Sequence, residues 1–202
     1  MPEIRALERR HLPEAGRLLG RAFLDNPAQL AALAHLSPTR RARVVEALHT
    51  SFCAAAVGHW TAEGLFAQDR LLGAMLVLAP GIYPPSLRAK LVALRGALGA
   101  GPRGLLNYAR IDAHMQGLHP PGPCHYLFIL GVDPPDQGRG HGRTLLNALS
   151  ARADASGLPC YLETDRESSK RLYERAGYRV IVDARIAGVN GLRMWTMRRD
   201  PP

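Results

Sequence analysis

Residues 131–149 read GVDPPDQGRGHGRTLLNAL, a turn between an apolar run and a helix with regularly spaced leucines. The turn contains three closely spaced glycines, Gly138, Gly140 and Gly142, and two arginines, Arg139 and Arg143. Glycine lets the main chain approach a ligand closely, and the start of a helix favours an anion. The stretch therefore predicts a strand-to-helix turn that binds an anionic ligand. The alternative is that the glycines only ease a tight bend.

The spacing excludes two common phosphate-binding motifs. A Walker A loop ending here requires glycine at position 137 and lysine at position 143, where the chain has Gln137 and Arg143. A dinucleotide GxGxxG motif that starts at Gly138 also requires glycine at position 143. The pattern that remains is QxxGxG, formed by Gln137, Gly140 and Gly142 and preceded by Val132.

Length and composition favour one folded domain over residues 1–202. The chain has 202 residues, of which 47% are hydrophobic, enough for a sizeable core. The longest apolar runs, 71–79 and 126–132, are too short to span a membrane, and the charged N-terminus has no apolar signal core. The three cysteines form no CxxC pair. We therefore expect a cytoplasmic protein with no membrane partner.

The charge balance is basic, but it does not by itself indicate nucleic-acid binding. The net charge is +9, and Lys90 and Lys170 are the only lysines among 26 basic residues. Aromatic residues make up 6% of the chain, and no basic patch with interleaved aromatics occurs. The eight histidines lie singly, without metal-ligand spacing. We expect neither a nucleic-acid partner nor a metal.

The pattern of apolar residues predicts a mixed α/β chain with an extended central sheet. Helical spacing over 85–118, interrupted by the sequence GAGPRG at 99–104, predicts an insertion of two helices. The first of them carries leucines at i, i+4, i+7 and i+11. The other expected strands are 3–7, 65–67, 71–78, 125–132, 159–164, 178–186 and 192–198, and the other helices begin near residues 13, 38, 141 and 167.

Two stretches resemble the GNAT superfamily of N-acetyltransferases. LGVDPPDQGRGHGRTLL, at 130–146, is similar to the acetyl-CoA signature, and YLETDRESSKRLYERAGYRV, at 161–180, is similar to the strand and helix that follow it. The resemblance implies a GNAT-like fold with a mixed sheet splayed in the middle and helices on both faces. It also implies acetyl-CoA as cosubstrate, with its pantetheine arm inserted between the strands at 125–132 and 159–164.

The resemblance also assigns the coenzyme contacts. The amides of residues 138–143 would face the pyrophosphate, and the strand edge at 130–132 would bond the pantetheine arm. Superfamily members often have an asparagine near the start of the next helix, where this chain has only Ser168 and Ser169, so a weaker contact is expected there. The predicted coenzyme residues are Leu130, Gly131, Val132, Gln137, Gly138, Arg139, Gly140, His141, Gly142, Arg143 and Ser169.

Three residues are candidates for the chemistry. By resemblance, Tyr173 would protonate the departing thiolate, a role that suits a phenol with a pKa near ~10. The amine must lose a proton before it attacks, and Glu163 is the first candidate base, with His125 the second. The structural alternatives are a packing role for Tyr173 and an ion pair with an arginine for Glu163. Asp112, His114 and His119 could face the acceptor.

Smaller similarities point to a branch of the superfamily. The sequences LHPPGPCHYLFILGVDP, LPCYLET and MWTMRR are similar to puromycin N-acetyltransferase and its relatives. The similarity is clear over about 119–199 and weak before it, where acceptor specificity is usually built. We expect an enzyme that acetylates a primary amine of a small molecule. Many members of the superfamily form homodimers. The alternatives are a non-catalytic acyl-CoA-binding domain and a protein or peptide acetyltransferase.

Overall fold

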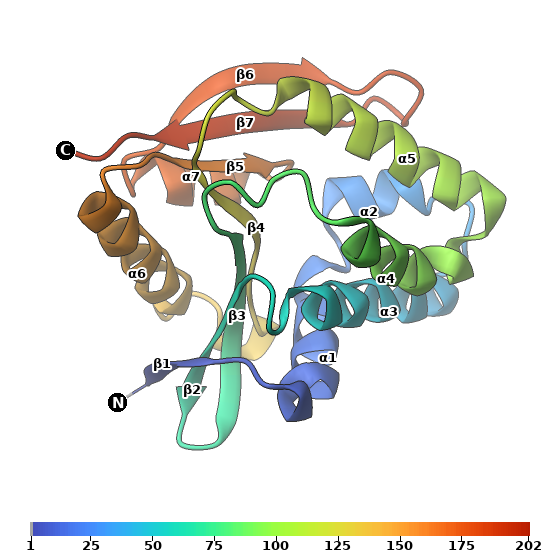
Figure 1. Cartoon of the computed structure of the whole chain (residues 1–202). Helices are drawn as coiled ribbons and strands as arrows, with labels where there is room; N and C mark the ends of the chain where they lie inside the picture. Colours follow the sequence, from blue (N-terminus) through green and yellow to red (C-terminus); the bar gives the residue numbers. More distant parts are fainter. Residues whose placement is uncertain (1) are drawn as a thin grey trace.

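In the computed structural model, which describes residues 2–202, the apolar runs form a seven-stranded mixed sheet (Figure 1). The strand order is β1-β2-β3-β4-β5-β7-β6, and neighbours are antiparallel except for β4 and β5, which are parallel. The predicted fold class is confirmed. The strands are β1 Glu3–Ala6, β2 Thr61–Ala67, β3 Arg70–Leu78, β4 His125–Val132, β5 Cys160–Thr164, β6 Arg179–Arg185 and β7 Arg193–Arg199.

Helices cover both faces of the sheet. On one face, α1 (Leu12–Phe23) packs against the sheet, with α3 (Pro38–Ala56) beside it, through leucines and alanines that meet β2, β3 and β4. On the other face, α6 (His141–Ser156) and α7 (Glu167–Glu174) enclose a second core with Leu145, Leu146 and Tyr173. The central strand β3 is buried along nearly its whole length, as expected for a strand covered on both faces.

Local signals explain where the helices begin and end. Ser37 caps α3 through a hydrogen bond that its hydroxyl accepts from the Arg40 amide, and Pro38 occupies the first helical position. Gly140 and Gly157, both left-handed, delimit α6. A short helix, α2 (Pro27–Ala32), was not predicted, although an asparagine followed by proline precedes it, the same kind of signal as at α3.

The parallel strands β4 and β5 pair for only three residues. The register joins His125 to Cys160, Tyr126 to Tyr161 and Leu127 to Leu162, and no further pair follows although both strands continue. At the same level, β4 has an extra residue, Phe128, because Leu127 and Ile129 pair with adjacent residues of β3. Such a bulge bends and twists a strand. It accounts for the divergence of β4 from β5, as predicted.

Residues between β3 and β4 form two helices, α4 (Leu87–Ala97) and α5 (Gly101–Leu118). The side of α4 that packs against α3 consists of small residues, Ala89, Gly96 and Ala97, which are buried. The leucines of α4 lie on the opposite side, in solvent. α5 packs against α2 and against the loop between β6 and β7. No helix among residues 2–202 has both the length and the hydropathy needed to cross a membrane.

Close packing of α1 against α3 holds α1 in its position on the sheet. A Cβ on Gly20 would lie 2.8 Å from the Cα of Glu46, so the backbones must separate if it is enlarged. We predict that Gly20→Ala lowers the free energy of unfolding by about 1–3 kcal/mol, measured by urea denaturation. Gly117→Ala is the matched control, because no atom lies within 4 Å of its added Cβ. A control as destabilised as Gly20→Ala would contradict the packing argument.

Candidate active site

A cleft of about 580 Å³ opens where β4 and β5 diverge. Its walls come from the end of α1, the outer half of β4, the glycine turn, the start of α6, the end of β5 and α7. Nearly all the residues singled out in the sequence meet here. Those that line the cleft are Leu130, Gly131, Val132, Gln137, Gly138, Gly140, His141, Gly142, Arg143, Glu163, Ser169 and Tyr173.

The glycine turn presents main-chain donors to one end of the cleft. Gly138 and Gly140 have φ values of 77° and 85°, which side chains with a Cβ rarely adopt. The space where their Cβ atoms would lie is open, so a ligand can reach the backbone. α6 begins at His141, and the first amides of a helix have no carbonyl partner within it. This end of the cleft therefore suits an anion.

The turn is braced by its own side chains. The Gln137 side-chain amide donates to the Val132 carbonyl at 3.0 Å, which closes the loop after β4. Arg70 binds both carboxylate oxygens of the buried Asp136, at 2.6 and 3.1 Å, and this holds the pKa of Asp136 below its usual value. Arg139 also lies 3.6 Å from Asp136 and does not line the cleft. Gln137 and Arg139 thus shape the loop in the structure.

The middle of the cleft is the unpaired edge of β4. Beyond Leu127, β4 keeps β3 on one side and has no strand on the other, so residues 128–132 turn that edge to the cleft. An extended chain carrying amides can add to such an edge as an extra strand. Ser168, Ser169 and Leu172 of α7 line the cleft, so the two serines lie where the expected asparagine is missing.

Tyr173 projects from α7 into the cleft wall and is otherwise buried. Burial raises its pKa well above the ordinary value of a phenol, and the nearby Asp165 carboxylate raises it further. The side chain is therefore protonated throughout the neutral pH range. It can donate a proton or a hydrogen bond to an acceptor that becomes strongly basic.

Glu163, at the end of β5, is the acid on the cleft whose pKa departs most from its ordinary value. Its Oε2 accepts a hydrogen bond of 2.6 Å from the Tyr126 hydroxyl, across the junction where the strands part. Its Oε1 is buried and has no partner among the described residues. Burial raises the pKa of Glu163 to about 7, against the opposite effect of the Tyr126 bond. A carboxylate with that pKa can exchange a proton at neutral pH.

Asp165 and Asn26, an acidic and a polar side chain that line the cleft, were not among the predicted site residues. Asp165, two residues after Glu163, accepts hydrogen bonds from the Ala28 amide at 2.7 Å and the Asn26 side chain at 3.2 Å. It thereby fixes the start of α2 to the end of β5. The period of two along a strand, which puts Glu163 and Asp165 on one face, was the available signal.

His125 does not reach the cleft. It lies on the face of β4 that meets α6, where its Nε2 is 2.9 Å from the Ser156 hydroxyl oxygen. Strand alternation explains this, because Tyr126 occupies the opposite face. His119 stacks on Tyr83, with ring centroids 3.7 Å apart, and its ring also lies 5.3 Å from that of Tyr126, the residue that bonds Glu163.

The remaining two acceptor-side candidates lie on α5. The charge of Asp112 contributes to the raised pKa of Glu163, after the larger effect of burial, and Asp112 does not line the cleft. The Nε2 of His114 is buried and has no partner among the described residues, and His114 does not line the cleft. No group of three or more metal-ligating side chains occurs among residues 2–202.

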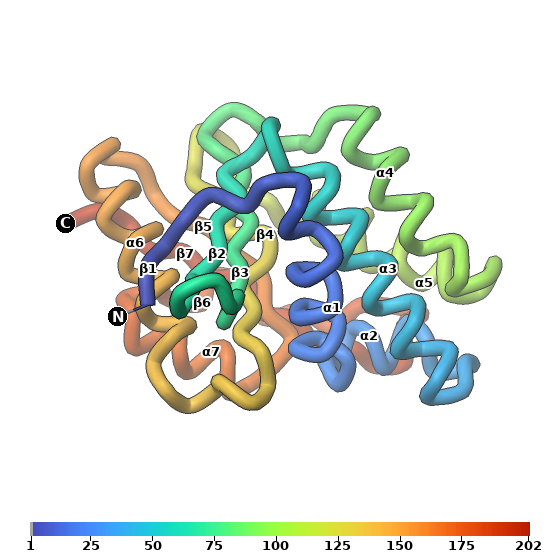
Figure 2. Tube along the Cα trace, turned by 90° about the horizontal axis from the view of Figure 1, so that it is seen from below, coloured from blue at the N-terminus to red at the C-terminus, as the bar shows by residue number. Residues whose placement is uncertain are grey.

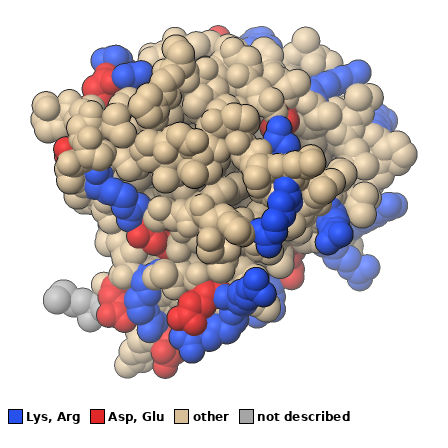
Figure 3. Space-filling model, viewed as in Figure 1, with Lys and Arg blue, Asp and Glu red and all other residues tan. Residues whose placement is uncertain are grey.

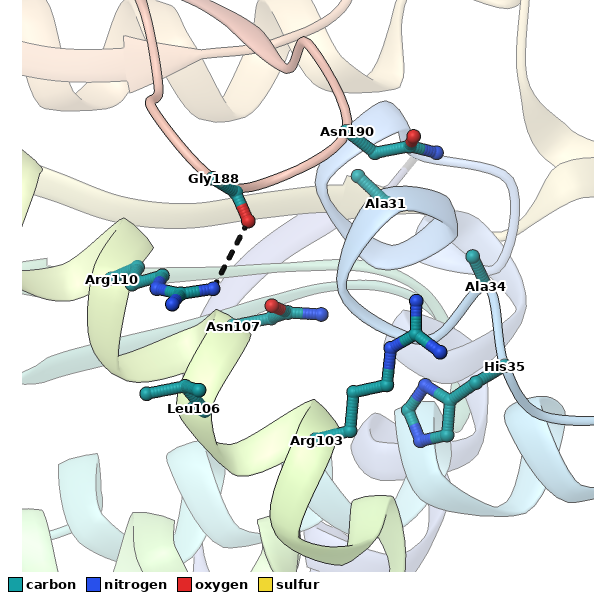
Figure 4. A pocket seen from close by; sticks show the side chains of 9 residues that line it. All are labelled: Ala31, Ala34, His35, Arg103, Leu106, Asn107, Arg110, Gly188 and Asn190. Carbon is teal, nitrogen blue, oxygen red and sulfur yellow. Dashed lines mark hydrogen bonds between the residues drawn. The ribbon is translucent and has the colours of Figure 1, made fainter.

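A second hollow, of about 350 Å³, lies between α2, α5 and the β6–β7 loop (Figure 4). Arg103 and Arg110 extend from α5 beside it, and Arg110 donates to the Gly188 carbonyl at 3.2 Å. No aspartate or glutamate lines this hollow. Its positive charge makes it a poor site for a protonated amine, in contrast to the acidic end of the cleft.

Comparisons with known proteins agree with this geometry. Residues 96–178 match the family model described as the acetyltransferase (GNAT) family. The chain is 37% identical over 97 residues to the N-alpha-acetyltransferase RimI of Mycobacterium tuberculosis, covering 48% of this chain and 60% of that protein. It is 34% identical over 76 residues to the mycothiol acetyltransferase of Geodermatophilus obscurus, covering 34% of this chain and 25% of that protein. The matches thus span less than two thirds of the length of each of these relatives.

Solved structures share the whole fold at low sequence identity. A structure described as histone acetyltransferase HPA2 and related acetyltransferase from Corynebacterium glutamicum superposes with a TM-score of 0.69 at 18% identity, covering 100% of this chain and 97% of that one. The polyamine N-acetyltransferase of Drosophila melanogaster superposes with a TM-score of 0.66 at 19% identity, covering 99% of this chain and 100% of that one. At these identities the likeness establishes the fold.

The raised pKa of Glu163 predicts a stability change that is independent of any activity. Because the folded state holds this proton up to about pH 7, ionising the side chain costs stability as the pH rises from 4.5 to about 7. Glu163→Gln removes that cost. We predict that the free energy of unfolding of the variant exceeds that of the wild type by about 1–2 kcal/mol at pH 8 and by little at pH 4.5. Urea denaturation at both pH values measures the difference. A difference in free energy of unfolding that does not depend on pH would contradict the raised pKa of Glu163.

Proposed function

We propose that this chain contains a GNAT-family acetyltransferase domain and transfers the acetyl group of acetyl-CoA to a primary amine of a small molecule. The observation that carries the proposal is the cleft between β4 and β5, with Glu163 and Tyr173 on its walls and main-chain donors at its end. An acid and a base with pKa values far apart suit a reaction that removes one proton and supplies another.

The cleft fits a ligand with the parts of acetyl-CoA. The pyrophosphate would lie at the start of α6, on the amides that follow Gly138 and Gly140, with Arg143 adding positive charge. The pantetheine arm would extend along the free edge of β4 from Val132 towards Leu130. The thioester would then reach the level at which the strands part, near Glu163 and Tyr173.

The chemistry follows from the two protonation states. An acceptor amine approaches as an ammonium ion, and the unpartnered Oε1 of Glu163 takes its proton at a pH above about 7. The neutral nitrogen attacks the thioester carbonyl, the C–N bond forms and the C–S bond breaks. Tyr173 donates its proton to the departing sulfur and is reprotonated by the second proton that the attacking nitrogen loses as it becomes an amide. The proton held by Glu163 is released to solvent. Tyr126 keeps Glu163 in place through its hydroxyl.

The acceptor class is inferred from what surrounds the reaction centre. The insertion of α4 and α5 lies between β3 and β4, and Asp112 of α5 is close enough to Glu163 to affect its pKa. No residue of α4 or α5 lines the cleft itself, but the end of α5 lies beside Tyr126 and Tyr161, next to Glu163. An acceptor that approaches Glu163 from this side meets α5, which favours a small amine over a folded protein. Acetylation of a protein N-terminus, the activity in the name of the RimI relative, is the second candidate, and a non-catalytic coenzyme-binding domain is the third.

Release of free thiol from acetyl-CoA, followed in the presence of a panel of small amines and of peptides with free N-termini, tests the proposal. We expect release that depends on a small amine and a matching increase of 42 Da by mass spectrometry, the mass of one added acetyl group. Activity on peptides alone would favour the second candidate. Coenzyme binding by calorimetry without any release would favour the third.

Loss of the Tyr173 hydroxyl should affect the chemical step alone. We predict that Tyr173→Phe lowers kcat by about a hundredfold, with the Kd for acetyl-CoA within about twofold of wild type. Tyr178→Phe is the control, since this neighbouring buried tyrosine does not line the cleft. Equal kcat values for the two variants would remove the acid role from Tyr173.

The bond from Tyr126 should set the pH at which activity appears. The Tyr126 hydroxyl stabilises the ionised form of Glu163, so its loss raises the pKa of Glu163 above about 7. We predict that Tyr126→Phe moves the acidic limb of the kcat/KM profile up by about one pH unit. Tyr108→Phe removes a similar hydroxyl on α5 and should leave the limb in place. A limb that does not move would exclude Glu163 as the base.

A further inference from the structure

The outward face of α4 is an apolar strip on the surface. Leu87, Leu91, Leu94 and Leu98 follow one another at four, three and four residues, and they are 73%, 51%, 47% and 59% exposed. Leu98 directly follows the last residue of α4 and keeps helical backbone angles. At 100° per residue, this spacing places all four in one narrow line along the helix. We call these four residues the leucine strip. Contiguous exposed apolar surface on a folded protein marks an interaction site.

The strip is not an accident of a loosely placed helix. On the other side of α4, Ala89, Gly96 and Ala97 are buried, and a Cβ on Gly96 would lie 2.7 Å from the Ala47 carbonyl oxygen. The small residues let α4 lie close against α3, and that contact fixes which side faces out. Burying the leucines in the fold would therefore expose the small face and break this packing.

Basic residues flank the leucine strip on both sides. On the helix surface, Arg88 and Arg95 lie along one edge and Lys90 along the other, and all three are exposed. The sequence contains no aspartate or glutamate between Asp69 and Asp112. The side of the molecule that α4 and α5 occupy in Figure 3 is correspondingly rich in blue side chains with little red. An occupant of this face must be apolar at its centre and negative around it.

These features favour a lipid surface over a second copy of the chain. A twofold contact through the strip would bring the same three cations together, without an acidic partner on the helix. The strip is also small, about 16 Å long and one helix wide, and specific protein interfaces bury roughly 800 Å² on each partner. An interfacial helix with leucines on one side and Lys or Arg beside them needs no such area.

We propose that α4 docks this protein on an anionic membrane surface, with the leucine strip among the acyl chains and Arg88, Lys90 and Arg95 at the phosphates. Figure 2 places α4 at the rim of the molecule, away from α6 and α7, so the coenzyme cleft stays open in the docked state. This peripheral contact differs from a membrane span, which the sequence and the helices of residues 2–202 both argue against.

Vesicle sedimentation tests the proposal without any assumption about activity. We expect the protein to sediment with vesicles of phosphatidylcholine and phosphatidylglycerol in equal parts and to stay in solution with phosphatidylcholine alone. Leu91→Glu combined with Leu94→Glu should reduce the partition coefficient by about tenfold or more. Arg88→Glu should reduce it by about fivefold or more, and added salt should weaken the binding of the wild type.

Leu106→Glu is the matched control, because Leu106 of α5 is 51% exposed and lies outside the strip. It should sediment like the wild type, and circular dichroism should give the same melting curve for every variant. Wild type that fails to sediment, or a double variant that sediments like the wild type, overturns the proposal. A dimer detected by analytical ultracentrifugation and dissolved by the double variant, with no vesicle binding, also overturns it in favour of a second copy.

Discussion

The site depends on one interruption of backbone pairing. β4 and β5 are parallel neighbours for three residues, and then an extra residue in β4 turns the strands apart. The divergence leaves one edge of β4 without a partner, opens the cleft and places the ends of both strands on opposite walls. The Tyr126–Glu163 hydrogen bond lies just at the junction, so the last contact between the strands also holds the carboxylate that we assign as the base.

Charge divides the two ends of the cleft. At one end, the amides before α6 and Arg143 favour an anion, and the Arg70–Asp136 pair holds the loop that presents them. At the other end, Glu163 and Asp165 are partly or wholly buried acids whose pKa values are raised by burial. The first end suits phosphates and the second suits a group that arrives with a positive charge. In the function that we propose, this separation would orient an acyl donor and an amine in opposite directions along one groove.

The insertion between β3 and β4 combines two different surfaces. α5 contributes to the interior through Met115, which packs on the β6–β7 loop, whereas α4 turns its largest apolar side chains outward. The helical periodicity of both segments is similar in sequence. Their opposite behaviour arises because α4 meets α3 through alanine and glycine, which allow closer backbone approach than leucine does.

The sequence by itself determined the mixed α/β class of fold and the glycine turn, because those features rest on local signals, whereas the coenzyme contacts were expected from the resemblance to a family. Positive-φ glycines, a helix start and continuous apolar strands need only neighbouring residues to be recognised. The tertiary structure alone decided which side chains meet at the reaction centre. His125 and Tyr126 are adjacent in the chain, yet the first faces α6 and the second bonds Glu163. Likewise, the direction of the α4 leucines depends on which face of the helix meets α3, and periodicity is the same for either direction.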